Sequence, residues 1–83
     1  MAEEKIGIVT HFFNNINVAA IKITHGELHV GDTIHITGAH TNFSQAVQRM
    51  EIDREPIEIA KPGDEIGIRV EKRVREHDLV YKE

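Results

Sequence analysis

Apolar and polar residues alternate in short runs along this chain, and residues that favour turns separate the runs. Because the side chains of a β-strand point alternately to its two faces, such runs predict half-buried strands. The first two runs, residues 5–13 and 17–24, flank Asn14 and Asn15, a pair that tolerates positive φ, and they predict a β-hairpin. In the second strand of this hairpin we expect the following side chains to point inward: Ala19, Ile21 and Ile23.

A Gly-Asp pair precedes an apolar alternation twice, at Gly31-Asp32 and at Gly63-Asp64. Gly and Asp favour tight turns, so each pair is predicted to lead into a strand that starts directly after the turn. Gly67 in the second of these strands falls on the outer face, where a missing side chain marks a bend or the close approach of another backbone. The apolar residues of the two strands are expected in the core: Ile34, Ile36, Ile66, Ile68 and Val70.

Residues 43–52 do not keep a single alternation. Phe43 and Val47 share one parity, whereas Met50 and Ile52 share the other. One extra residue between Val47 and Met50 would place all four apolar side chains on the core side. The pattern therefore predicts one bent strand with a β-bulge at this point.

No window keeps a helical period over three turns, and six or seven short strands with regularly spaced turns account for the chain. Pro56 predicts an edge strand or a loop, because proline cannot donate a hydrogen bond to a neighbouring strand. The sequence therefore predicts an all-β fold, in the form of a small closed six- to seven-stranded barrel. With a length of 83 residues, the chain is expected to form a single β-barrel domain over residues 1–83.

Composition narrows the setting in which the protein works. Cysteine is absent, which excludes disulfides and agrees with a reducing cytosol. The longest apolar runs have four residues, so we expect no membrane span and a cytoplasmic protein. The net charge of −4 argues against binding of nucleic acid through a general excess of positive charge.

One segment departs from this acidic balance. Positions 69 to 75 hold four basic residues and one acidic residue, a local charge of +3. This segment is the candidate surface for RNA or for a protein partner, and the alternative is an ordinary solvated strand edge. The candidate residues are Arg69, Lys72, Arg73 and Arg75.

The residues that carry chemistry in other proteins show no catalytic arrangement here. His25 and His29 are four positions apart, but Gly26 between them argues against the helical turn that a two-histidine metal motif needs. Ser44 is the single serine and lies outside any Gly-x-Ser-x-Gly motif, and no phosphate-binding loop occurs. We therefore predict no catalytic residue, no metal site and no cofactor, and a protein that is not an enzyme.

Residues 26–38, with the sequence Gly-Glu-Leu-His-Val-Gly-Asp-Thr-Ile-His-Ile-Thr-Gly, resemble the middle of the second domain of translational GTPases such as elongation factor Tu. The resemblance continues through residues 47–50, 60–68 and 78–82 and so spans about the whole chain. It is greatest to free-standing proteins described as translation elongation factor-like. Similar domains end the collagenase-like peptidases, some of which act in RNA hydroxylation.

This resemblance implies a Greek-key barrel of the translation-protein type. It also implies a non-catalytic binding module that acts on RNA, such as tRNA or rRNA, or on a protein of the translation or RNA-modification machinery. The alternative hypothesis is an accessory subunit that completes a peptidase-like or RNA-modifying enzyme encoded elsewhere. A small metalloenzyme that depends on histidine is a third hypothesis, which the spacing of the six histidines does not favour.

Overall fold

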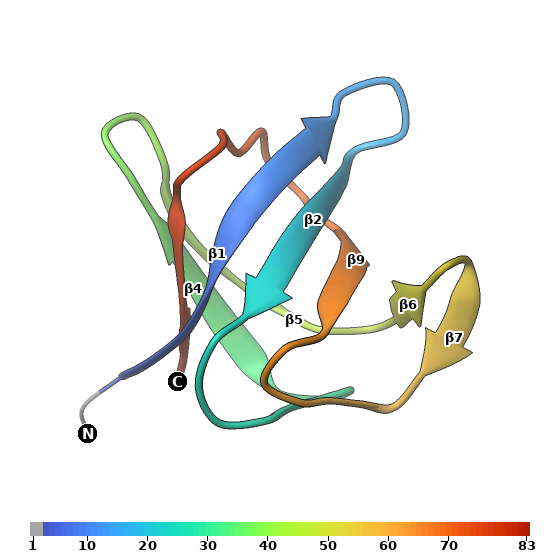
Figure 1. The fold of residues 1–83 in the computed structure, drawn as a ribbon. Helices are drawn as coiled ribbons and strands as arrows, with labels where there is room; N and C mark the ends of the chain where they lie inside the picture. Colours follow the sequence, from blue (N-terminus) through green and yellow to red (C-terminus); the bar gives the residue numbers. More distant parts are fainter. Residues whose placement is uncertain (1–2) are drawn as a thin grey trace.

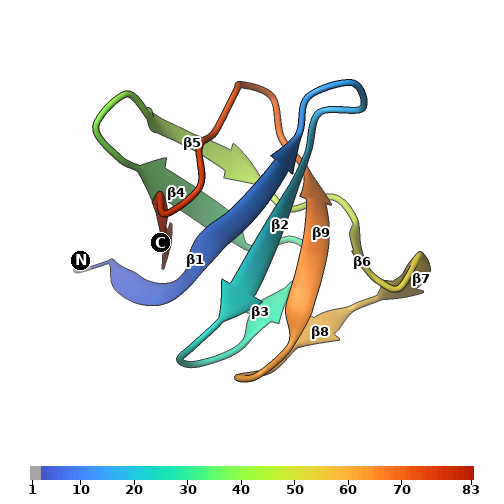
Figure 2. The ribbon, with the colours of Figure 1, turned by 45° about the horizontal axis from the view of Figure 1, so that its top comes forward.

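The computed structural model describes residues 3–83, which form ten β-strands and no helix (Figure 1, Figure 2). The strands are β1 (Glu4–Phe13), β2 (Val18–Ile23), β3 (Leu28–His29), β4 (Thr33–Thr37), β5 (Asn42–Ala46), β6 (Met50–Ile52), β7 (Glu55–Ile57), β8 (Ile59–Ala60), β9 (Glu65–Arg69) and β10 (Leu79–Lys82). Eight of them make one sheet in the order β5-β4-β10-β1-β2-β9-β6-β7, and β3 pairs with β8 in a second sheet. Neighbouring strands are antiparallel throughout.

The all-β prediction is confirmed, but the predicted closed barrel is not. The edges of the large sheet are β5 and β7, which do not pair with each other, so no ladder of hydrogen bonds completes a ring within residues 3–83. The sheet is instead strongly curled, and β4 and β5 lie behind β1 and β2 in the view of Figure 1. Strands are also more numerous than predicted, because short pieces such as β3 and β8 add to the longer strands.

β1 and β2 form the predicted hairpin, and the expected inward side chains Ala19, Ile21 and Ile23 are fully buried. Positive φ occurs at Asn17, with a value of 56°, rather than at the Asn14-Asn15 pair. The pairing of β1 with β2 shifts register between Val9 and His11, and its pairing with β10 shifts near its start. These irregularities bend β1 so that it follows the curl of the sheet.

The predicted Gly-Asp turns are present, and a third turn of the same kind occurs near the end of the chain. In each, an aspartate carboxylate accepts a hydrogen bond from the backbone N–H three residues earlier, at 2.8 Å for Asp32, 2.9 Å for Asp64 and 2.9 Å for Asp78. The backbone N–H of each aspartate in turn donates to the carbonyl oxygen of that earlier residue. The three turns lead into β4, β9 and β10, so one local device starts three strands of the large sheet.

The residue before each of these aspartates has a positive φ. It is 101° at Gly31, 96° at Gly63 and 75° at His77. Glycine adopts this conformation without strain, whereas a residue with a Cβ atom does so at a cost. The third turn was not recognised in the sequence because histidine stands where the other two copies have glycine.

The predicted bulged strand over residues 43–52 is instead two strands. β5 ends at Ala46 and pairs with β4, whereas β6 begins at Met50 and pairs with β9 and β7. The alternation breaks because the chain changes partners there, and not because of one extra residue in a continuous ladder. Pro56 lies in β7, which is an edge strand as predicted.

The core contains sixteen buried apolar side chains, which come from both sheets and from the segments that connect their strands. One of them, Val74, is only 1% exposed, although it lies within the stretch that reads as basic. The core residues are Ile6, Val9, Ala19, Ile21, Ile23, Leu28, Ile34, Ile36, Val47, Met50, Ala60, Ile66, Ile68, Val70, Val74 and Val80.

Candidate functional site

The four predicted basic residues lie at the end of β9 and in the loop that follows it. All four are exposed, and none of them forms an ion pair with a carboxylate in residues 3–83. The buried side chain of Val74 anchors this loop to the core between Arg73 and Arg75. Lys72 lies over the ring of Phe43, with its Nζ atom 6.0 Å from the ring centroid. We call Lys72, Arg73 and Arg75 the basic loop, since Arg69 belongs to a different surface feature.

An open hollow of about 570 Å³ lies on the outer face of β2, β6 and β9. Its floor includes Gly67, which leaves free the space that a side chain would fill beside Val18 of the neighbouring strand. The prediction that Gly67 faces outward is thus confirmed. Ile16, at the tip of the hairpin, is 55% exposed and forms one apolar wall.

A second open hollow of about 570 Å³ is formed where β5 meets the end of β9. Arg49 and Arg69 line both hollows, so we call the two together the arginine groove. The Nε atom of Arg49 lies 2.9 Å from Glu51 Oε2. Arg69, in contrast, forms no ion pair with a carboxylate of the described residues, so its guanidinium group is available to a ligand. Sequence reasoning found Arg69 but missed Arg49, which stands outside the basic segment.

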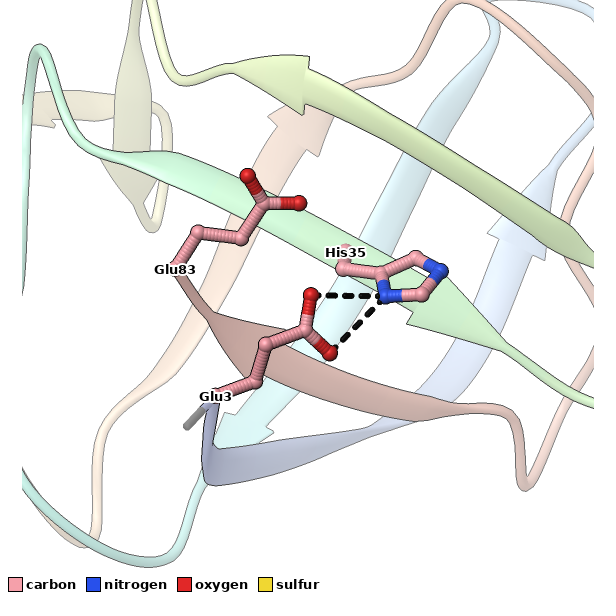
Figure 3. Close-up of side chains that lie close together, drawn as sticks. All are labelled: Glu3, His35 and Glu83. Carbon is pink, nitrogen blue, oxygen red and sulfur yellow. Dashed lines mark hydrogen bonds and ion pairs between the residues drawn. The ribbon is translucent and has the colours of Figure 1, made fainter. Parts of the chain in front are cut away.

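A separate polar cluster lies where β1, β10 and β4 run side by side (Figure 3). Glu3 precedes β1, His35 lies in the middle of β4 and Glu83 follows β10. The Nδ1 atom of His35 is 2.9 Å from each carboxylate oxygen of Glu3. The potential ligand atoms of all three residues lie within 4.8 Å of one another.

Two further side chains orient this cluster. The Nε2–H of His35 donates to the amide oxygen of Asn42 at 2.6 Å, and the hydroxyl of Ser44 donates to Glu83 at 2.6 Å. The hydrogen bond to Asn42, followed by that to Glu3, raises the pKa of His35 above its ordinary value. The spacing of these residues along the chain gave no signal for the cluster, because three strands are needed to bring positions 3, 35 and 83 together.

Within residues 3–83 no helix is long and apolar enough to cross a membrane.

Comparison with known proteins relates the chain to peptidases. No model of a protein family matches it. It is 40% identical over 78 residues to an uncharacterized protease of Methanocaldococcus jannaschii, a match that covers 93% of this chain and 19% of the relative. It is 36% identical over 78 residues to a collagenase of Porphyromonas gingivalis, which covers 93% of this chain and 22% of the relative. The chain thus spans about a fifth of the length of these curated relatives.

Solved structures share the fold. The C-terminal domain of a candidate U32 peptidase of Geobacillus thermoleovorans superposes with a TM-score of 0.89 at 18% identity, covering 96% of this chain and 92% of that one. The selenomethionine variant of the same domain gives a TM-score of 0.87 at 16% identity, covering 93% of this chain and 96% of that one. At these identities the likeness shows a common fold and not a common activity.

These matches overturn three predictions from the sequence. The relationship to translation elongation factors is wrong, because the relatives are a protease and a collagenase and the structural neighbour is a peptidase domain. The prediction that the protein is not an enzyme is contradicted by the same relatives, which are named as a protease and as collagenases. The RNA-binding module inferred from translation factors loses its basis with them. The misleading signal was the Gly-Asp turn with the strand after it, which belongs to the scaffold of the fold.

Proposed function

We propose that this chain acts as a domain of a U32-type peptidase and that its arginine groove holds an extended segment of polypeptide for that enzyme. The observation that carries the proposal is the 40% identity to the archaeal protease, which extends over 93% of this chain. The proposal follows the alternative hypothesis from the sequence, that of an accessory part of a peptidase-like enzyme.

The shape of the arginine groove suits an extended polypeptide. Its two hollows are open and share Arg49 and Arg69 as lining residues, whereas sites for small molecules are usually enclosed and bury most of the ligand. Gly67 opens the floor of the groove, and the exposed side chain of Ile16 supplies an apolar contact at one end. A polypeptide in extended conformation presents side chains at intervals that could reach both hollows.

The guanidinium group of Arg69 favours a segment with acidic residues, whereas the groove as a whole carries no net charge, because Glu51 and Glu71 line it together with the two arginines. A guanidinium group can bind a carboxylate through two parallel hydrogen bonds. Arg69 has no carboxylate partner among the described residues, and Arg49 is paired only with the half-buried Glu51. The partner that fits this surface is therefore a polypeptide segment that combines an apolar residue with one or more carboxylates.

Two further proposals concern the rest of the surface and the setting. The exposed cations of the basic loop are a candidate contact for an acidic surface of a protein partner. The cytoplasmic location stays a prediction from composition.

Binding of matched synthetic peptides to the purified chain tests the groove. One peptide carries glutamate at alternate positions, and its control carries glutamine at the same positions. We expect the glutamate peptide to bind more tightly by about threefold or more, since each exposed ion pair contributes about 0.2–1 kcal/mol. The difference should disappear in the double variant Arg49→Ala/Arg69→Ala.

The matched control for this experiment is Lys61→Ala, which removes an exposed cation in the turn before β9, outside the arginine groove. Its preference for the glutamate peptide should equal that of the wild-type chain. Equal binding of both peptides by the wild-type chain, or an equal loss in Lys61→Ala and in the double variant, would reject the groove as the binding surface.

A further inference from the structure

We propose that Glu3, His35 and Glu83 form a binding site for a divalent transition-metal ion such as Zn²⁺ (Figure 3). The site shares no residue with the arginine groove, and the proposal does not depend on the link to peptidases. It is carried by the convergence of three potential ligand residues, one histidine and two glutamates, and by the hydrogen bonds that hold two of them.

The distances within the cluster allow all three residues to bind one ion. Zinc binds histidine nitrogen and carboxylate oxygen at about 2.0–2.2 Å, so two ligand atoms on one tetrahedral ion lie roughly 3.4 Å apart. The potential ligand atoms here lie within 4.8 Å of one another. Both carboxylates belong to glutamates, whose flexible side chains can close a gap of up to about 1.4 Å by rotamer changes.

The surroundings of the ligands match those of known metal sites. A metal-binding histidine almost always donates its second ring N–H to an acceptor, which leaves the other nitrogen free for the metal. Here His35 Nε2–H donates to Asn42 at 2.6 Å, and Nδ1 faces the carboxylates. Glu83, in turn, accepts a hydrogen bond from Ser44 at 2.6 Å. Asn42 and Ser44 are two positions apart on β5, so their side chains point to the same face of the strand. One strand therefore orients two of the ligands.

The charge and composition of the site define the ion. The metal displaces the proton on His35 Nδ1, which leaves to water, and the neutral imidazole with two carboxylates then balances the charge of a divalent cation. Imidazole suits zinc, copper, nickel and iron, whereas calcium and magnesium favour sites made of oxygen ligands alone. Three protein ligands leave a further position on the metal for water or for a group of a binding partner.

The chain contains internal controls for this proposal. His11 pairs with Glu76 at 3.3 Å, and His29 pairs with Glu27 at 3.2 Å. Each of these pairs has one carboxylate and is about half exposed, whereas the side chain of His35 is 23% exposed and faces two carboxylates. If the cluster were an ordinary surface ion pair, the three histidines would behave alike toward a metal.

Titration of Zn²⁺ into the metal-free full chain, followed by calorimetry, tests the site. We expect one equivalent to bind in the wild-type chain and the affinity to fall at least about tenfold in His35→Gln, Glu3→Gln and Glu83→Gln. Asn42→Ala should weaken binding by about 10- to 100-fold, the usual effect of removing a group that orients a ligand. His29→Gln should bind as the wild type does.

Glu83→Gln keeps the test meaningful if another variant fails to fold, because this residue follows the last strand and its side chain is exposed. Absence of binding by the wild-type chain would overturn the proposal. So would equal affinity of the wild type and Glu83→Gln, because the proposed site includes Glu83 as a ligand. Neither result would bear on the peptidase proposal, because peptides and metal are measured separately.

Discussion

The amide nitrogen of Gln45 donates a hydrogen bond of 2.9 Å to the carbonyl oxygen of Arg69, and this contact joins two strands that are not paired in the sheet. The amide oxygen of the same side chain accepts the backbone N–H of Glu71 at 2.8 Å. Gln45 thus offers one donor and one acceptor, as a neighbouring strand would. A buried side chain, 7% exposed, takes the place of strand pairing where β5 meets the end of β9.

Gln45→Ala should lower the free energy of unfolding by about 1–3 kcal/mol, because it leaves a backbone donor and an acceptor without partners. The control is Gln48→Ala, an exposed glutamine in the segment after β5, which should change stability by less than about 0.5 kcal/mol. Urea unfolding followed by circular dichroism measures both. A loss in Gln45→Ala no larger than in the control would mean that Gln45 does not hold the curl of the sheet.

Substitutions in two of the three aspartate turns should change the stability of the fold in opposite directions. No atom lies within 4 Å of a Cβ added to Gly31, so Gly31→Ala should destabilise only through its φ of 101°, by about 1–2 kcal/mol. His77 carries a similar strain at a φ of 75°, and His77→Gly relieves it while raising the entropy of the unfolded chain. We expect His77→Gly to be neutral or to stabilise by up to about 1 kcal/mol. Thermal unfolding should give Gly31→Ala a melting temperature below that of the wild type. The melting temperature of His77→Gly should equal or exceed the wild-type value.

Gly67→Val separates stability from binding. A Cβ at this position would lie 3.4 Å from Val18 Cγ1, an ordinary contact, and β-branched residues favour strands. The variant should therefore fold at least as well as the wild type. Since its side chain fills the floor of the arginine groove, it should bind the glutamate peptide more weakly than the wild-type chain does. Unchanged peptide binding in a folded Gly67→Val variant would place the peptide elsewhere.

Much of the scaffold could be predicted from the sequence because it is encoded locally. The strict alternation around Ile34 and Ile66 fixes which faces are buried, and the preceding Gly-Asp turns fix where the strands begin. The closure of the sheet could not be predicted in the same way. Closure depends on whether strands far apart in the sequence pair at their edges. Where β5 meets the end of β9, the side chain of Gln45 makes the hydrogen bond instead of a paired strand, and alternation alone does not predict this.

The candidate sites were less predictable than the fold. Arg49 and Arg69 are 20 positions apart in the numbering of the chain and share a groove only because the chain changes partners between β5 and β6. The cluster around His35 includes Glu3 and Glu83, which lie near opposite ends of the chain, so no local spacing in the sequence predicts it. A resemblance carried by turn residues pointed first to translation factors, whereas the relatives are a protease and a collagenase.

The most direct test of the central proposal is the kcat/KM of a chimera, measured on collagen. In this chimera the present chain replaces the 78-residue match in the Porphyromonas gingivalis collagenase. We expect its kcat/KM to stay within about tenfold of that of the collagenase, a loss of about 1.4 kcal/mol in transition-state stabilisation, and to exceed that of a collagenase that lacks the segment. A folded chimera that is no more active than this deletion would contradict the proposal that the chain acts as a domain of a U32-type peptidase.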